Sequence, residues 1–199
     1  MSAPKPNGFP VQLDLTGRPC LLVGGGRIAL RKAEQLIQVG ADLTVIAPAI
    51  DPGFSALKVK TFVRPYITGD VSNYWLVITA TGNHEVDQLI FDEAESLRIW
   101  CNSADDPERC SFILPAVHRQ GPITISVSTC GASPALASWL RHEIAALVGP
   151  EYQDLVMRLA AERAAVKADG HSTEDIDWCP IIDSAIEELG ITAPGSVKS

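Results

Sequence analysis

The chain has 199 residues, a length that suits one substantial domain with a smaller appendage. Hydrophobic residues make up 46% of it and charged residues 20%, which is the composition of an ordinary globular protein. The net charge of −8 disfavours binding to nucleic acid or to an anionic membrane surface, although a local basic pocket can still hold a small anion. The segment Met1–Gly8 lacks the pattern of a signal peptide and no apolar run is long enough to span a membrane, so we expect a cytoplasmic protein.

Five cysteines are spread along the chain without any Cys-x-x-Cys pair: Cys20, Cys101, Cys110, Cys130 and Cys179. This spacing predicts neither a disulfide framework nor a structural zinc site. Two of them, Cys20 and Cys101, lie in apolar runs and are expected to be small buried hydrophobic residues.

Strand and helix signals alternate through the first half of the chain. The apolar run Cys20–Val23 predicts a buried parallel strand, and a helical pattern follows from Arg27 to Val39 with Gly40 as its terminal cap. Further strands are expected at Leu43–Ala47, Val59–Val63, Trp75–Ala80 and Ile99–Cys101, and a second helix at Glu85–Leu97 with Val86, Leu89, Ile90 and Leu97 on its inner side. This alternation predicts an α/β fold with a Rossmann-like, doubly wound parallel sheet.

The second half of the chain has a different pattern. A strand is expected at Ile123–Ser128, and Ser133 followed by Pro134 predicts the start of a helix that ends near Gly149. That helix carries Leu136, Leu140, Ile144 and Leu147 on one side, and two more helices are expected at Pro150–Lys167 and Glu174–Leu189. We therefore expect a Rossmann-like domain at 1–112, a strand-helix linking segment at 113–148 and a small helical C-terminal domain at 149–199.

The glycine turn after the first strand has the spacing of a dinucleotide-binding motif, Gly24-x-Gly26-x-x-Ala29. Gly24 permits a tight turn, Gly26 lets the backbone approach a pyrophosphate, and Ala29 allows close packing of helix on strand. The free N–H groups of the helix start favour phosphate binding. A plain turn without a ligand is the alternative, but the position at the first strand-helix junction favours the binding interpretation.

One expected element of the motif is missing. Rossmann units that bind NAD usually end the second strand with an acidic residue for the ribose hydroxyls. Here the corresponding stretch, Val45–Ala49, has no acid, and Asp42 and Asp51 lie before and beyond it. No arginine is placed for a 2′-phosphate either, so this rule leaves NAD and NADP open.

Seven stretches carry a more specific likeness: Phe9–Val11, Leu13–Leu15, Val23–Lys32, Leu76–Thr81, Cys101–Asp105, Ser111–Ala116 and Ile125–Ala137. Together and in this order they resemble the precorrin-2 dehydrogenase family, which includes the N-terminal module of siroheme synthases. The likeness extends from Phe9 to Val148. A single glycine motif is weak evidence, whereas the ordered set is specific.

The resemblance implies a reaction in which NAD⁺ accepts a hydride from precorrin-2 to give sirohydrochlorin. Some family members also insert Fe²⁺ and so act as sirohydrochlorin ferrochelatases. Members are typically homodimers whose middle segment forms much of the interface. The family tolerates a second strand without the ribose acid, which implies that Pro48 and Ala49 lie against the adenosine.

Asp105 is the predicted catalytic residue, because it follows the fifth strand at the ligand-binding edge and matches the key aspartate of the family. A carboxylate there can act as general base for the proton lost during oxidation and for the pyrrole protons displaced by a metal. The alternative is that it caps the turn that Pro107 follows, a role we assign instead to Asp106. The predicted cofactor-binding residues are Gly24, Gly25, Gly26, Arg27, Ile28, Pro48, Ala49, Thr79, Ala80, Thr81 and Asn102.

A substrate with many carboxylates needs polar and basic partners. Ser128, Thr129 and Gly131 form a hydroxyl-rich turn that could seat a carboxylate or simply cap the following helix. Basic candidates are His118, Arg119, Arg141 and His142, which could equally be surface charges, as we expect for Arg31 and Lys32. No cluster has the spacing of a metal site, so any chelation would use the macrocycle nitrogens.

Two other functions compete with this interpretation. A regulatory domain that senses NAD without catalysis would share the glycine turn but would not need Asp105 or the segment from Ser111 onward. A short-chain reductase would need a Tyr-x-x-x-Lys pair, which is absent after Tyr66, Tyr74 and Tyr152.

Overall fold

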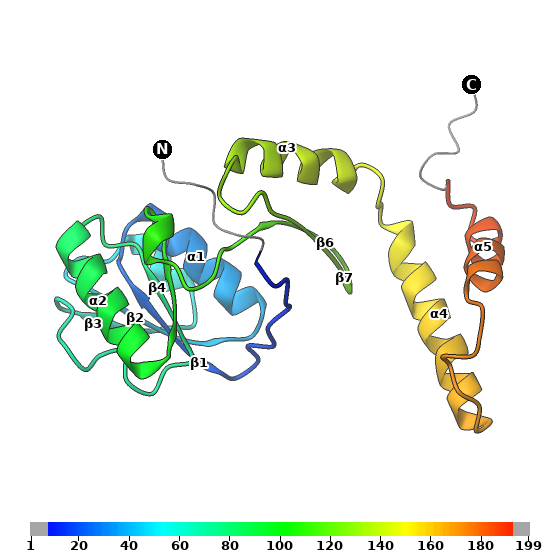
Figure 1. The fold of residues 1–199 in the computed structure, drawn as a ribbon, viewed down its shortest axis with the longest axis horizontal. Coiled ribbons are helices and arrows are strands. Elements are labelled where there is room, and N and C mark those ends of the chain that lie inside the picture. Colours follow the sequence, from blue (N-terminus) through cyan, green and yellow to red (C-terminus); the bar gives the residue numbers. More distant parts are fainter. Residues whose placement is uncertain (1–7, 193–199) are drawn as a thin grey trace. The chain divides into compact units, whose positions relative to one another are not determined.

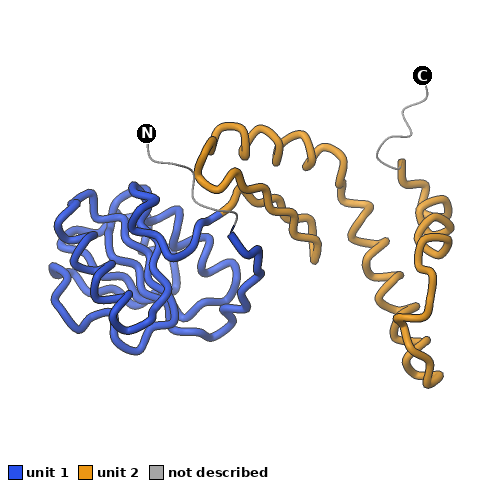
Figure 2. Tube along the Cα trace, viewed as in Figure 1, with its two compact units in different colours: residues 1–114 blue, residues 115–199 orange. Residues whose placement is uncertain are grey.

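The structure is a computed structural model that describes residues 8–192, so all of Met1–Gly8 except the glycine lies outside the described part. The chain divides into two compact units, Met1–Leu114 and Pro115–Ser199 (Figure 2). The boundary between the first two expected parts lies within two residues of this division. A separate domain from residue 149 onward stays a prediction.

Unit 1 is built on a sheet of five parallel strands with the order β3-β2-β1-β4-β5. The strands are β1 (Pro19–Val23), β2 (Asp42–Ala47), β3 (Lys60–Val63), β4 (Leu76–Thr79) and β5 (Trp100–Ser103). Helices α1 (Arg27–Gln38) and α2 (His84–Leu97) pack on opposite faces, and the short 3₁₀ helices η1 (Pro52–Ala56) and η2 (Pro107–Arg109) follow β2 and β5 (Figure 1). The predicted Rossmann-like fold is therefore confirmed.

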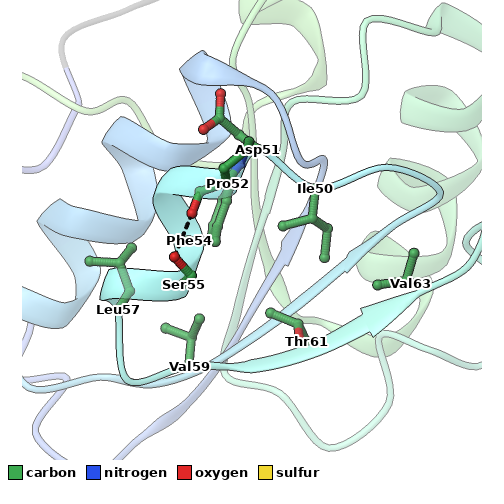
Figure 3. A pocket seen from close by; sticks show the side chains of 9 residues that line it. All are labelled: Ile50, Asp51, Pro52, Phe54, Ser55, Leu57, Val59, Thr61 and Val63. Carbon is green, nitrogen blue, oxygen red and sulfur yellow. Dashed lines mark hydrogen bonds between the residues drawn. The ribbon is translucent and has the colours of Figure 1, made fainter.

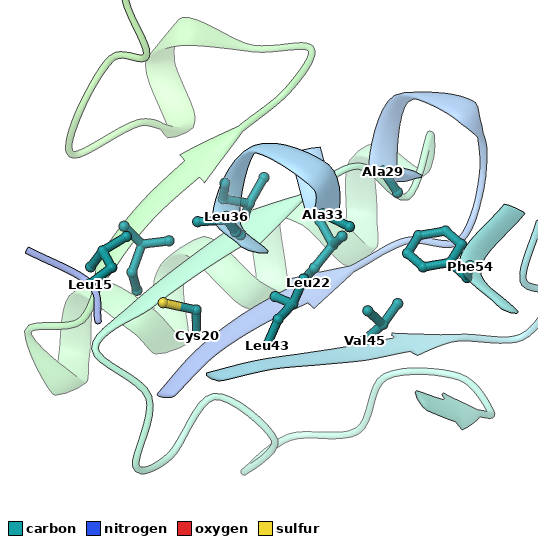
Figure 4. Close-up of a cluster of buried hydrophobic side chains, with 11 residues drawn as sticks. Leu15, Cys20, Leu22, Ala29, Ala33, Leu36, Leu43, Val45 and Phe54 are labelled. Atoms are coloured by element: carbon teal, nitrogen blue, oxygen red, sulfur yellow. The ribbon is translucent and has the colours of Figure 1, made fainter. Parts of the chain in front are cut away.

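Each face of the sheet has its own hydrophobic core, because successive residues of a strand point to opposite sides. On the α1 face, Cys20 and Leu22 of β1 pack with Ala29, Ala33 and Leu36 (Figure 4). On the α2 face the core comprises Leu21, Val23, Ile46, Val71, Val77, Ile90, Ala94 and Cys101. The burial predicted for two cysteines is confirmed, and it raises the pKa of Cys20 to about 11 and that of Cys101 to about 12.

The buried side of α2 differs from the predicted one. Leu89 is 47% exposed and Leu97 is 48% exposed, so their expected inward position is wrong. The buried residues of this helix are Asp87, Ile90 and Ala94. The buried face of α2 is therefore narrow, and two of its residues are a small one, Ala94, and a charged one, Asp87. A pattern of hydrophobic residues alone does not predict their burial.

Unit 2 begins with a two-stranded antiparallel hairpin, β6 (Ala116–Gln120) and β7 (Ile123–Val127), on which α3 (Pro134–Ala145) packs. As predicted, Ser133 caps α3, its Oγ accepting from the Leu136 N–H at 3.3 Å. Helices α4 (Glu151–Ala168) and α5 (Cys179–Glu188) pack against each other around Leu155, Ala185 and Ile191. None of the helices within residues 8–192 has both the length and the hydropathy of a membrane span.

Unit 2 differs from the sequence-based expectations in three elements. The sequence predicts no strand at β6. Several residues of this strand are polar, so its pairing with β7 cannot be recognised from the sequence. Helix α3 ends at Ala145, before Gly149, and it buries Ala137 while Leu136 and Leu147 are exposed. Helix α5 begins at Cys179 rather than Glu174, because side chains in the preceding turn bond to the backbone and compete with a helix.

Candidate active site

The glycine turn lies where three loops of unit 1 meet at the carboxyl edge of the sheet. Gly24 has a φ of +134°, and a Cβ there would lie 2.2 Å from the carbonyl oxygen of Ala80, after β4. A Cβ on Gly25 would lie 2.0 Å from the carbonyl oxygen of Ala49, after β2. Both positions therefore require glycine for the fold itself, and this confirms the tight turn predicted at Gly24.

Gly26 differs from its two neighbours because an added Cβ would meet nothing within 4 Å. It is exposed and forms the N-cap of α1, where no side chain caps the helix and no acidic residue occupies the first turn. Arg27 and Ile28 are exposed beside it, while Ala29 is fully buried against the sheet as predicted. By contrast, Asn83 caps α2 through the N–H groups of the first turn of that helix.

This arrangement fits a bound dinucleotide. The start of an α-helix leaves N–H groups without partners, and at α1 no side chain caps them while the space beside Gly26 is open. At the ends of β4 and β5, the hydroxyl oxygens of the register partners Thr79 and Ser103 are buried without a hydrogen-bond partner among the described residues. Gly26 and the first turn of α1 are thus suited to hold a pyrophosphate.

Each acidic residue near β2 has a partner within the protein. Asp42 begins the strand and pairs with Lys60 at 3.3 Å, away from the carboxyl edge. The Asp51 carboxylate accepts from the N–H of Gly53 at 2.8 Å and so caps η1. Pro48 and Ala49, between the strand and this cap, are both exposed.

The loop after β4 is anchored to α2. The Thr81 hydroxyl donates to the buried carboxylate of Asp87 at 2.8 Å, so this side chain is engaged within the protein. Asn102 is likewise engaged, because its amide nitrogen donates to the Phe112 carbonyl oxygen at 2.9 Å. A cofactor role for either residue stays a prediction.

Asp105 lies between β5 and η2 with an exposed side chain. Its carboxylate has no hydrogen bond or ion pair with any other described residue. Its neighbour Asp106 is the N-cap of η2, accepting from the Glu108 N–H at 2.8 Å, and it pairs with Arg109 at 3.0 Å. Asp106 is therefore the turn residue, as predicted, and Asp105 is left free for a ligand.

Arg109 is a residue of this region that sequence reasoning missed. It is only 7% exposed and contacts Asp106 of η2 together with His84 and Gln88 of α2. The only signal in the sequence is its spacing of three residues from Asp106, which gives no hint of the contacts made 21 and 25 residues earlier in the chain.

The predicted carboxylate seat lies in unit 2, whereas the glycine turn and Asp105 lie in unit 1. The Ser128 hydroxyl accepts from the Cys130 N–H at 3.1 Å, and the Thr129 hydroxyl accepts from the Ser133 N–H at 3.0 Å. Gly131 has a φ of +84°. Both hydroxyls therefore serve the turn that leads into α3, and their role toward a substrate stays a prediction.

Lys32 differs from the solvated charge that the sequence predicts. It is partly buried, and burial lowers the pKa of its ammonium group, with a smaller contribution from Arg31. His118 is also engaged, since its Nε2 lies 3.4 Å from the carbonyl oxygen of Val148 and must donate to it.

Unit 1 contains two pockets. The larger, about 430 Å³, lies between η1 and strand β3 (Figure 3) and is lined by Ile50, Asp51, Pro52, Phe54, Ser55, Leu57, Val59, Thr61 and Val63. The smaller lies at the start of β5, around Trp100 and Arg98. Neither is lined by the glycine turn or Asp105. Within residues 8–192 no group of His, Cys, Asp and Glu side chains could hold a metal ion.

Comparison with known proteins identifies the family. Residues 11–116 match the NAD(P)-binding family model, and residues 120–147 match the model of the central part of sirohaem biosynthesis proteins. Siroheme synthase 3 of Aeromonas hydrophila subsp. hydrophila is 37% identical over 165 residues, which are 80% of this chain and 35% of that protein. The siroheme synthase of Acinetobacter baylyi is 37% identical over 187 residues, 90% of this chain and 41% of that protein.

The fold is also shared with a solved structure, that of SirC, a precorrin-2 dehydrogenase. The TM-score is 0.70 with 22% sequence identity, covering 92% of this chain and 99% of that one. The chain spans little more than a third of the length of the curated siroheme synthases that it matches. By its sequence it belongs to the NAD(P)-binding family whose model matches residues 11–116.

Proposed function

We propose that this protein oxidises precorrin-2 to sirohydrochlorin with NAD⁺ in siroheme biosynthesis. The observation that carries the proposal is the free, exposed carboxylate of Asp105 after β5, at the sheet edge where the uncapped glycine turn begins α1. The likeness to siroheme synthases supports the choice of substrate, and that to SirC supports the fold on which such a reaction is carried out.

Different residues would bind the cofactor and remove the proton. Gly26 and the first turn of α1 would hold the pyrophosphate, and Ala80 and Ala49, which follows Pro48, lie against the same glycine turn. Bound NAD⁺ supplies the acceptor for the hydride that leaves the macrocycle. Oxidation also releases one proton, which the Asp105 carboxylate takes as general base. Its exposure leaves it open to a large planar substrate.

We propose NAD⁺ rather than NADP⁺ as the cofactor because of the charge of the loop after β2. No arginine or lysine lies between residues 48 and 57, and Asp51 in this stretch is acidic. A 2′-phosphate on the adenosine ribose would therefore meet no cation there and one nearby carboxylate. We expect NAD⁺ to bind at least about tenfold more tightly than NADP⁺.

Fe²⁺ insertion into sirohydrochlorin is proposed as a second use of the same carboxylate. The metal is here a substrate, held by the macrocycle nitrogens, and Asp105 removes the pyrrole protons that it displaces. Ferrous iron offered to sirohydrochlorin under anaerobic conditions tests this step separately from the oxidation.

A homodimer formed through unit 2 is also proposed. A two-stranded sheet is marginally stable on its own, and the hairpin β6–β7 is covered by a single helix. Trp139 and Leu136 on that helix, α3, are exposed apolar side chains. A second copy that covers them would stabilise both elements.

Replacing Asp105 with alanine tests the proposed reaction. We expect NAD⁺-dependent formation of sirohydrochlorin, followed by anaerobic spectroscopy, to fall at least about 100-fold because the general base is lost. The affinity for NAD⁺ is expected to stay within about twofold, since Asp105 is not part of the glycine turn. The matched control is Glu108→Gln, an exposed carboxylate three residues away that should leave the rate unchanged.

Full turnover in the alanine variant would exclude Asp105 as the base. Absence of turnover in the unchanged protein, with NAD⁺ binding intact, would favour the alternative of a regulatory NAD-binding domain without catalysis.

A further inference from the structure

Arg109 joins two elements of unit 1 that are distant in the sequence. Its side chain is buried between η2 and the start of α2. Nη2 lies 3.0 Å from the Asp106 carboxylate, and Nη1 lies 2.7 Å from Nε2 of His84 and 3.5 Å from the side-chain oxygen of Gln88. The guanidinium of Arg109 thus connects the turn at the start of η2 with the first turns of α2.

The chemistry of these contacts fixes their direction. A guanidinium only donates hydrogen bonds, so Nε2 of His84 is the acceptor in this contact. The Asp106 carboxylate compensates the buried positive charge. A lysine has a single ammonium group in place of the planar fork and would not span both partners equally well.

The segment that carries Asp105 is held on both sides of this residue. Before it, the Ala104 N–H donates to the Thr79 carbonyl oxygen at 2.9 Å, which ties the chain to β4. After it, Asp106 is bound by Arg109, and the Arg109 N–H donates back to the Asp106 carbonyl oxygen at 3.2 Å. Asp105 itself makes no side-chain contact that would fix its position.

We propose that Arg109 is a positioning residue for Asp105, fixing its carboxylate by clamping the Asp106 turn to α2. This inference rests on the proposed function, because it assigns a role within the same reaction. Arg109 is buried and its guanidinium is bound to Asp106, His84 and Gln88, so we expect its effect to pass through Asp105. A small displacement of a catalytic group is enough to lower a rate by about two orders of magnitude.

The test is Arg109→Met, which keeps the length of the side chain and removes its charge and hydrogen bonds. We expect kcat for precorrin-2 oxidation to fall about 10- to 100-fold, while the NAD⁺ affinity stays within about twofold. In the Asp105→Ala background the same change should lower the residual rate less than about twofold, because the group it positions is gone. Arg109→Lys should restore part of the lost rate.

A purely structural role would give a different result. Arg109→Met would then lower the unfolding midpoint but leave kcat of the folded protein within about twofold, or would reduce the rate equally in both backgrounds; either outcome overturns the proposal. His84→Ala removes one contact and keeps the Arg109–Asp106 pair. It provides a milder variant if the methionine variant fails to fold, with an expected loss of about threefold in kcat.

Hydrogen exchange tests the role of Arg109 independently of the proposed function, because the measurement needs no substrate. Peptides over residues 103–111 should exchange at least about tenfold faster in Arg109→Met, while peptides over residues 19–30 stay unchanged. Unchanged exchange in the first segment would show that Arg109 is no clamp. Failure of the unchanged protein to oxidise precorrin-2 would reject the proposed function, and the exchange result alone would then decide whether Arg109 fixes this segment.

Discussion

At the scale of single residues, the three consecutive glycines differ in what surrounds each of them. Gly24 has a left-handed φ and lies against the backbone of Ala80. Gly25 is pressed against the backbone of Ala49. Gly26 meets no obstacle within the protein, so nothing in the fold demands it. We propose that the missing side chain of Gly26 leaves room for a ligand. Substitutions at Gly26 and Gly25 can test this difference between the two positions.

Gly26→Ser should separate binding from folding. Serine is a favourable N-cap, so we expect the free energy of unfolding to stay within a few tenths of a kcal/mol of its original value or to rise. The added side chain would occupy the open space and its hydroxyl would cap N–H groups of the first turn, so the Kd for NAD⁺ should rise at least about tenfold. Calorimetric titration measures the affinity, and urea unfolding measures the stability.

The matched control is Gly25→Ala. Its Cβ would overlap the Ala49 carbonyl oxygen, and we expect a loss of about 1–3 kcal/mol in the free energy of unfolding. Undiminished NAD⁺ binding by the serine variant would argue against the pyrophosphate position.

At the scale of elements, the connection after β3 shows how a polar loop is fixed to the sheet. Arg64 binds Asp70 through both carboxylate oxygens, at 2.6 and 2.8 Å. The N–H of Ile67 donates to the same carboxylate at 2.9 Å. These interactions, with the hydrogen bond to Arg64 as the largest, hold the pKa of Asp70 below its ordinary value of 3.8.

This lowered pKa predicts how stability changes with pH. Because the folded state favours the charged carboxylate, the contribution of Asp70 is fully present above about pH 4 and is lost as the pH falls through the lower folded-state pKa. Asp70→Asn should therefore lower the urea midpoint by about 0.3 M at pH 7 and leave it nearly unchanged near pH 2. The exposed Glu34→Gln on α1 is the control, and an equal loss at both values of pH would contradict the assignment.

At the scale of the whole molecule, the two units differ in how much core each contains. Unit 1 has a hydrophobic core on each face of its sheet, whereas the buried hydrophobic cluster in the described part of unit 2 is the small one between α4 and α5. Helix α3 exposes the apolar side chains of Leu136 and Trp139 instead. This is the composition expected of a segment that completes its core with a second chain.

Trp139→Glu should therefore disrupt the proposed homodimer. Trp139 is 57% exposed on α3, and a carboxylate there would be costly to bury against a partner. We expect the mass measured by light scattering to halve at micromolar concentration, while Met157→Glu on α4, equally apolar and exposed, leaves it unchanged. A monomeric unchanged protein would refute this assembly.

The sequence by itself determined the fold of the first unit and the position of the glycine turn between its first strand and helix. Apolar strands that alternate with amphipathic helices have few ways to be buried, and a glycine turn between the first strand and helix marks the edge where ligands bind. The role of Asp106 in the turn and the capping by Ser133 were also predictable, because both depend on residues within four positions.

Only the tertiary structure decided the features that depend on contacts between distant parts of the chain. The partial burial of Lys32, the exposure of Leu89 and the pairing of β6 are set by neighbours that no local pattern contains. The same holds for Arg109, whose partners on α2 come 21 and 25 residues earlier. Local propensity predicts the turn, helix or strand in which a residue lies. Whether a charged side chain is buried depends instead on the partners that the complete fold places next to it.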